Sequence, residues 1–138
     1  MKFFEVREHI DAPPDRVWAI LTDAPKLAAG RFGIVKVEGV IRPGARLKVW
    51  SESAPKRAFP LRVTEFAPPS RMVWTGGMPL GLFRGVRQFN LSATPTGTAF
   101  HMREEYWGLL LPLIWPSIPD LNPGFEKFAR GLKAMAER

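Results

Sequence analysis

The spacing of apolar residues changes to a two-residue period at Gly33 and returns to a helical period after Trp107. Between these points apolar and polar side chains alternate, and clusters of Pro, Gly and Ser interrupt the alternation. Alternation is typical of half-buried strands, and such clusters are typical of turns. We therefore expect six strands, over residues 34–40, 44–52, 57–67, 71–78, 82–94 and 98–107. Sequential strands with short connections predict an antiparallel meander. Pro60, inside the third of them, predicts an edge or a bulge at that point.

The residues before the meander predict one more strand and two short helices. Residues 2–10 alternate in the same way and predict a first strand. Asp11 is in position to cap a helix that continues to about Thr22. A second helix is expected over residues 25–29, before Gly30.

The residues after the meander predict one long amphipathic helix, over about residues 118–137. Phe125, Phe128, Leu132 and Met135 recur at helical spacing and form one apolar stripe. Ser117, Asp120 and Asn122 are all suitable N-cap residues, and the sequence does not choose among them.

The predicted order is therefore β–αα–ββββββ–α, an α+β fold with a curved antiparallel sheet of about seven strands wrapped around the C-terminal helix. The 138 residues fit a single domain, residues 1–138. A sheet curved around one helix leaves space that side chains fill incompletely, and a small-molecule cavity is expected there.

Composition excludes several classes of site. The chain has no Cys and only two His, so zinc fingers, disulfides and thiol catalysis are excluded, and we expect no metal and no cofactor. His9 and His101 fall on the outward parity of their strands, which predicts solvated side chains. The loop at residues 76–81 is rich in Gly but has no phosphate-binding pattern. The N-terminus lacks the uncharged run of a signal peptide, so a cytoplasmic protein is expected.

The register of the last two strands predicts a polar cluster inside the fold. A two-residue turn with Thr94 opposite Gly97 places Arg87 opposite Glu104 and Gly85 opposite Tyr106. The same register pairs apolar residues with one another, Phe89 with Met102 among them. Two interpretations of the Arg87–Glu104 pair stay open. In the first, the two residues do no more than neutralise each other's buried charge. In the second, Arg87 orients an acidic or carbonyl group of a ligand while Tyr106 donates a hydrogen bond.

Several stretches resemble one family. The opening Ile10-x-Ala12-Pro13-x-x-x-Val17-Trp18-x-x-Leu21-Thr22-Asp23 is similar to that of the START-like, Bet v 1-type helix-grip superfamily (SRPBCC), in its polyketide cyclase/dehydrase and lipid-transport branch. The stretches from Val63 to Trp74, at Gly97-Thr98, from Glu104 to Gly108 and from Phe125 to Glu137 are also similar. One departure is that Phe32 is the only aromatic residue shortly after the second helix, where relatives often have Trp.

The resemblance implies the helix-grip fold and a small hydrophobic or amphipathic ligand between sheet and C-terminal helix. We expect the ligand to contact the polar cluster and the apolar side chains Trp74, Phe89, Met102, Phe128 and Leu132. The first alternative is an enzyme, a cyclase, dehydratase or hydrolase, in which Glu104 is the only suitable general acid or base.

The second alternative is a module that binds a membrane or a protein through a basic surface. Residues 31–103 hold 12 basic and 3 acidic side chains, and the rest of the chain holds 8 basic and 10 acidic ones. The outward parity predicts a basic outer sheet face, and its simplest interpretation is a solvated surface. Its members are Lys36, Arg46, Lys48, Arg62, Arg84 and Arg103. Nucleic acid is not expected as a partner, and both a monomer and a homodimer fit the sequence.

The apolar run from Leu109 to Trp115 also has more than one interpretation. It could be a lid over the cavity or an edge that touches a membrane. It could also simply pack under the last helix or against a partner chain.

Overall fold

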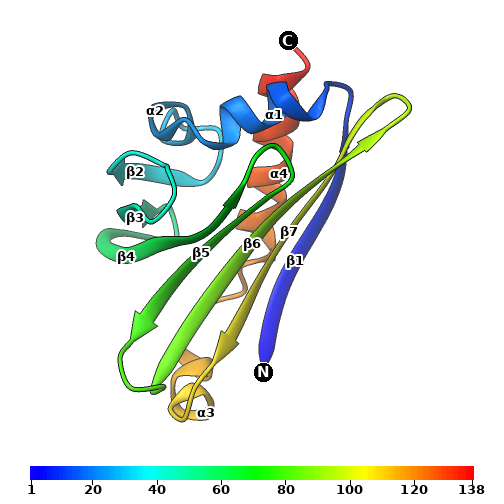
Figure 1. Cartoon of the computed structure of the whole chain (residues 1–138). Helices are drawn as coiled ribbons and strands as arrows, with labels where there is room; N and C mark the ends of the chain where they lie inside the picture. The colour runs from blue at the N-terminus through cyan, green and yellow to red at the C-terminus, as the bar shows by residue number, and fades with distance from the viewer.

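The computed structural model describes residues 1–138 and contains one antiparallel sheet of seven strands in the order β1-β7-β6-β5-β4-β3-β2 (Figure 1). The alternating pattern explains the strands, since successive side chains of a strand point to opposite faces of the sheet and one of these faces is covered by the helices. Their bounds are Lys2–Ile10 (β1), Ile34–Glu38 (β2), Arg46–Ser51 (β3), Ala54–Ala67 (β4), Arg71–Met78 (β5), Phe83–Thr94 (β6) and Gly97–Trp107 (β7). The predicted antiparallel meander is confirmed, and β1 joins it beside β7.

Helices cover one side of this curled sheet. Two short helices, α1 (Pro14–Leu21) and α2 (Ala24–Leu27), follow β1, and the long helix α4 (Asn122–Ala136) closes the chain. In Figure 1 the sheet curves in front of α4, which runs along its concave side. The predicted α+β helix-grip architecture is thus confirmed. None of the helices is long and apolar enough to span a bilayer.

The start of α4 differs from the prediction. The helix begins at Asn122 rather than near residue 118, because a one-turn helix α3 (Leu111–Ile114) and a 3₁₀ turn η1 (Trp115–Ser117) precede it. A proline lies in the first turn of each, which is the part of a helix where proline is readily accommodated. These short turns have no hydrophobic period, so the sequence pattern did not reveal them.

The predicted N-caps are also partly wrong. Asp11 does not cap α1; its carboxylate pairs with His9, and Pro13 occupies the cap position. Of the three candidates for α4, Asp120 comes nearest, since its carboxylate accepts a hydrogen bond from the backbone of Asn122 at 3.0 Å.

The core lies between the inner sheet face and the apolar stripe of α4. Phe128 is 2% exposed. Its ring centroid lies 5.1 Å from Phe32, 5.9 Å from Phe89 and 6.3 Å from Phe100. Phe32, the departure from the resembled family, is therefore a core residue that packs against α4.

The pairing from β2 to β5 is irregular at three places, the first of them between β2 and β3 at Ile34/Lys36. The register also shifts once between β3 and β4 and once between β4 and β5, the last at Val63/Glu65. Pro60 pairs with Lys48 on one side, and the pairing of β4 with β5 stops at the next residue, Leu61. Proline has no backbone N–H to donate to a second neighbouring strand, which explains why the pairing with β5 ends there.

Candidate functional site

The β6–β7 hairpin has the predicted register. Thr94 lies opposite Gly97, Arg87 opposite Glu104 and Gly85 opposite Tyr106, with no bulge between them. Because side chains alternate across a sheet, Arg87, Glu104 and Tyr106 all point to the concave side. We call these three residues the polar cluster.

The side chains of the polar cluster are joined by hydrogen bonds to one carboxylate oxygen. Arg87 Nη2 lies 3.0 Å from Glu104 Oε2, and the Tyr106 hydroxyl donates to the same oxygen at 2.8 Å. The Arg87 and Glu104 side chains keep 21% and 16% of their surface exposed. The pair therefore sits at the margin of the core, where solvent or a ligand can reach it.

Tyr106 is the most perturbed ionisable group of the cluster. Its burial, and secondly the negative charge of Glu104, raise the pKa of its hydroxyl well above the usual value of 10.0. Tyr106 consequently stays protonated near neutral pH, so it can donate a hydrogen bond but cannot act as a base.

Aromatic rings from three other elements, and one from β6 itself, surround the polar cluster. The Arg87 guanidinium lies 4.9 Å from the ring centroid of Phe125 on α4. Trp115 of η1 lies 5.7 Å from Tyr106 and 5.6 Å from Phe4 of β1, and Phe83 of β6 lies 6.2 Å from Tyr106. No sequence pattern predicts this group of rings, since only the tertiary structure brings these distant residues together.

The α3–η1 segment, residues 111–117, covers this end of the fold. Leu111 is buried and Trp115 is half-buried against the cluster. Trp115 therefore packs against residues of β1 and β7, whereas Leu109 and Leu113 stay exposed.

The apolar residues expected to contact a ligand lie deeper than expected. Trp74, Phe89, Met102, Phe128 and Leu132 are all at most 2% exposed and belong to one packed cluster. In this structure they fill the space between sheet and helix rather than border an open cavity. Trp74 differs from the others in having a polar atom, and its buried Nε1 has no hydrogen-bond partner. Because Trp74 pairs with Arg87 across β5 and β6, this free donor belongs to the same inward row as the polar cluster.

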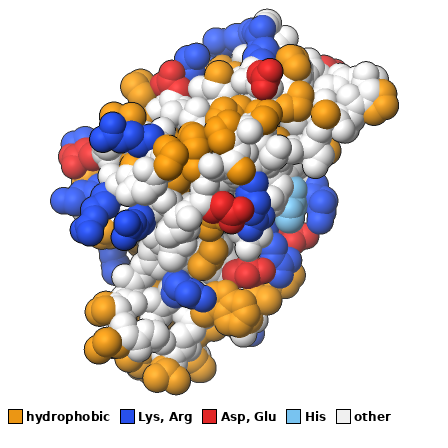
Figure 2. Space-filling model, in the orientation of Figure 1, with side chains coloured by type: hydrophobic (Ala, Val, Ile, Leu, Met, Phe, Trp, Pro, Cys, Tyr) orange, Lys and Arg blue, Asp and Glu red, His pale blue; other side chains and the backbone are white.

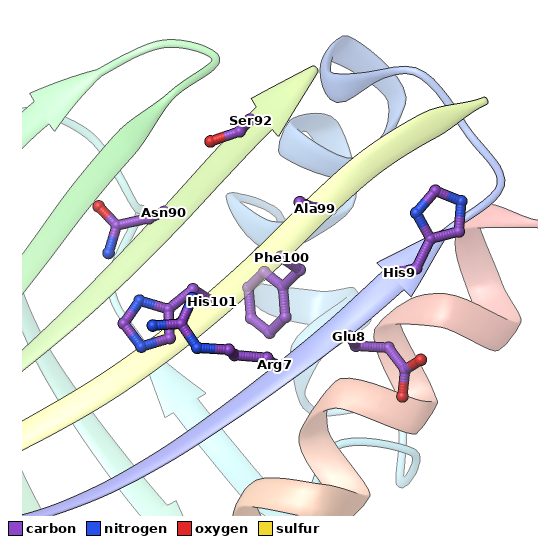
Figure 3. Close-up of a pocket in the computed structure, with 8 residues that line it drawn as sticks. All are labelled: Arg7, Glu8, His9, Asn90, Ser92, Ala99, Phe100 and His101. Atoms are coloured by element: carbon purple, nitrogen blue, oxygen red, sulfur yellow. The ribbon is translucent and has the colours of Figure 1, made fainter. Parts of the chain in front are cut away.

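Two hollows lie outside the space between sheet and helix. One, of about 400 Å³, lies between the α1–α2 region and the loop at Gly39–Ile41. The other, of about 370 Å³, is on the outer sheet face, where Arg7 of β1 lies opposite His101 of β7 (Figure 3). Both are open and lack the enclosed apolar lining of a lipid site.

An ion network occupies the outer face beside the second hollow. Arg103 contacts Glu5 at 2.7 Å and Glu105 at 2.9 Å, and His101 Nε2 lies 3.6 Å from Glu5. The hydrogen bond from Arg103 is the main reason that the pKa of Glu5 is lowered. No group of three or more His, Cys, Asp or Glu side chains is arranged to hold a metal ion.

The predicted basic face is exposed at most of its members. Arg46, Lys48, Arg62 and Arg84 are exposed, and Arg46 stands directly opposite Arg62. Figure 2 shows Lys and Arg atoms gathered on the left, over the β2–β4 side of the sheet. Two members are paired with acids: Arg103 in the ion network, and Lys36, 3.1 Å from Glu38.

Comparisons with known proteins place this geometry in context. The sequence profile of the family described as polyketide cyclase / dehydrase and lipid transport matches residues 1–138. No curated protein sequence matches the chain.

Solved structures of similar fold share little sequence with the chain. A protein from Mesorhizobium loti is 19% identical, with a TM-score of 0.74 over 97% of this chain and 96% of that one. The Aha1 dimer from Colwellia psychrerythraea is 19% identical, with a TM-score of 0.74 over 99% and 97%. The di-domain ARO/CYC StfQ of the steffimycin biosynthetic pathway is 15% identical, with a TM-score of 0.71 over 98% of this chain and 50% of StfQ.

Proposed function

Because this chain belongs to the polyketide cyclase/dehydrase and lipid transport family, we propose that it binds a small amphipathic molecule at the polar cluster, between the sheet and α4. The observation that carries the proposal is the convergence of Arg87, Glu104 and Tyr106 at the partly exposed margin of an aromatic-rich core. A ligand there would place its polar group on the cluster and its apolar part among the surrounding rings.

The free hydrogen-bonding capacity of the cluster indicates which polar groups it would accept. Only Nη2 of Arg87 is used by Glu104, so the other guanidinium N–H groups are free to donate. Glu104 uses Oε2 for both of its protein partners, which leaves Oε1 to accept from a ligand hydroxyl. A ligand with a carbonyl or carboxylate next to a hydroxyl would suit both residues.

Two further features support a ligand at this place. The buried Trp74 Nε1 has no acceptor within the protein, and buried donors normally have one. Gly85 has no side chain beside the cluster, and even a methyl group there would lie 3.4 Å from Glu104 Oε1. A carbonyl oxygen brought by the ligand would satisfy the tryptophan. Access to the deeper apolar residues would require the α3–η1 segment to move aside.

Binding can be tested with the fluorescent probe 1-anilinonaphthalene-8-sulfonate, whose sulfonate and aromatic rings mimic such a ligand. We expect Arg87→Met to weaken probe binding about tenfold, because charge-assisted hydrogen bonds are lost. Arg84→Met is the matched control, since Arg84 lies on the same strand but is exposed on the outer face. Equal effects of the two substitutions would contradict the proposal. Independently of the probe, native mass spectrometry of the purified protein would identify a copurified ligand.

An enzymatic version of the same site would depend on Glu104. Its carboxylate is 16% exposed and holds one oxygen free of protein partners, as a general base requires. In that case Glu104→Gln would still bind the natural ligand but would accumulate it unreacted in native mass spectra. An identical ligand profile in both proteins would favour simple binding.

A further inference from the structure

Exposed apolar side chains are concentrated at one end of the molecule. Met78 is the last residue of β5, and Leu80 follows it in the β5–β6 connection; Trp107 is the last residue of β7, Leu109 follows it, and Leu113 lies in α3. Their exposed fractions are 45%, 91%, 41%, 80% and 77%, so the three leucines are almost fully in solvent. We call these five residues the apolar tip. In Figure 2 it corresponds to the hydrophobic atoms at the lower end of the molecule, below the charged face.

The two segments of the apolar tip are bound into one unit. Leu109 N donates to Gly81 O at 3.1 Å, and Leu110 N donates to Leu82 O at 2.8 Å. These backbone hydrogen bonds fix the two loops side by side although they are far apart in the sequence. The leucines are therefore presented together as one surface rather than as unrelated exposed residues.

The backbone at Leu80 is unusual for an exposed residue. Its φ of 60° lies in the left-handed region, which Gly, Asn and Asp favour and which Leu rarely adopts. A branched apolar side chain is thus held in solvent in an unfavourable backbone conformation. Strain of this kind is concentrated at functional positions.

The two segments that carry the apolar tip contain cations but no acidic residue. Residues 77–87 and 106–119 contain no Asp or Glu. Arg84 is exposed beside the tip, and Lys2 Nζ lies 5.8 Å from the ring centroid of Trp115. In a bilayer with anionic lipids, cationic side chains favour the charged headgroups, tryptophan favours the interface and leucine favours the hydrocarbon. The apolar tip and its neighbours offer all three kinds of side chain.

We propose that the apolar tip docks on an anionic lipid bilayer, with Leu80, Leu109 and Leu113 inserted and Trp107 at the headgroup level. A second copy of the chain fits less well, because two tips that carry the same positive charges would repel each other. The tip also projects at the end of the long β6 and β7 strands (Figure 1). A projecting end buries little area against a rigid partner but inserts readily into a fluid layer.

Docking would also have a consequence for the ligand site proposed above. This consequence, unlike the docking itself, depends on that proposed function. The α3–η1 segment carries Leu113 on its outside and packs Trp115 against Tyr106 on its inside. Docking would therefore bring the cover of the polar cluster to the membrane, where amphipathic molecules dissolve.

Flotation of the protein with vesicles tests the proposal directly. The vesicles are made of phosphatidylcholine alone or mixed with phosphatidylserine, and the variant is the double substitution Leu109→Asp/Leu113→Asp. We expect the protein to float with the mixed vesicles, and the double variant to bind on the order of a hundredfold more weakly. The matched control is Val35→Asp/Val40→Asp, two exposed apolar residues outside the tip, and it should bind as the unchanged protein does. Thermal unfolding of both variants shows whether they are folded.

Three results would overturn the proposal. The first is failure of the unchanged protein to float with either vesicle type. The second is binding that survives Leu109→Asp/Leu113→Asp but disappears when Arg46, Lys48 and Arg62 are all changed to Glu, which would transfer the membrane contact to the basic sheet face. The third is a concentration-dependent dimer in sedimentation that Leu109→Asp abolishes, which would make the tip a self-association surface. Probe binding at the polar cluster is measured without vesicles, so failure of either proposal leaves the other testable.

Discussion

Tyr106 is the chain's single tyrosine, so its ionisation can be followed without interference from another phenol. Burial and the neighbouring Glu104 raise its pKa above 10.0 in the folded state, while the unfolded chain titrates near the ordinary value. The folded state therefore retains its proton above pH 10, and the free energy of unfolding falls as the pH rises beyond that value. We expect tyrosinate absorbance to appear only together with unfolding, seen by circular dichroism. Glu104→Gln removes one of the causes and should lower the pH at which tyrosinate forms. A smooth titration of the native protein centred near pH 10 would contradict the buried hydrogen bond.

The helix α4 provides a prediction in which packing opposes helix propensity. In an exposed helix, replacing Gly by Ala stabilises by up to about 1 kcal/mol. At Gly131, however, a Cβ would collide with the backbone carbonyl of Arg31, which packs against the helix there. We expect Gly131→Ala to lower the melting temperature. Gly124→Ala, in the first turn of the same helix, meets no atom within 4 Å and should leave the melting temperature unchanged or raise it. The measurement is thermal unfolding by circular dichroism, and equal shifts in one direction would refute the close approach of residue 31.

At the scale of the whole molecule, one core joins the sheet, α1, α2 and α4. Phe128 contacts Phe32, Phe89 and Phe100, which belong to three different segments. We expect Phe128→Ala to reduce the free energy of unfolding by about 3–5 kcal/mol, and to do so in one cooperative transition if residues 1–138 form a single domain. Phe59→Ala, at a 38% exposed position of β4, is the control and should have a much smaller effect. Denaturant titration followed by tryptophan fluorescence measures both. An unchanged midpoint for Phe128→Ala would mean that α4 does not pack on the sheet.

The sequence by itself determined the meander, the amphipathic C-terminal helix and the register that brings Arg87 to Glu104. The physical reason is that the two-residue period admits one alignment in which Phe89 and Leu91 face the same side as Met102 and Phe100. The sequence pattern also predicted the face on which the polar cluster lies, because parity along a strand continues past its apolar residues.

Only the tertiary structure decided what surrounds that cluster and how full the interior is. Phe4, Phe125 and Trp115 come from separate elements, and no local period relates them. The packing of Phe128 against Phe32 fills space that the pattern alone left open as a cavity, because volume is a sum over distant side chains. The same holds for the apolar tip, since backbone hydrogen bonds between two loops, not their sequences, place Leu80 beside Leu109. Periodicity encodes which way a side chain points, whereas its neighbours depend on how the whole chain closes.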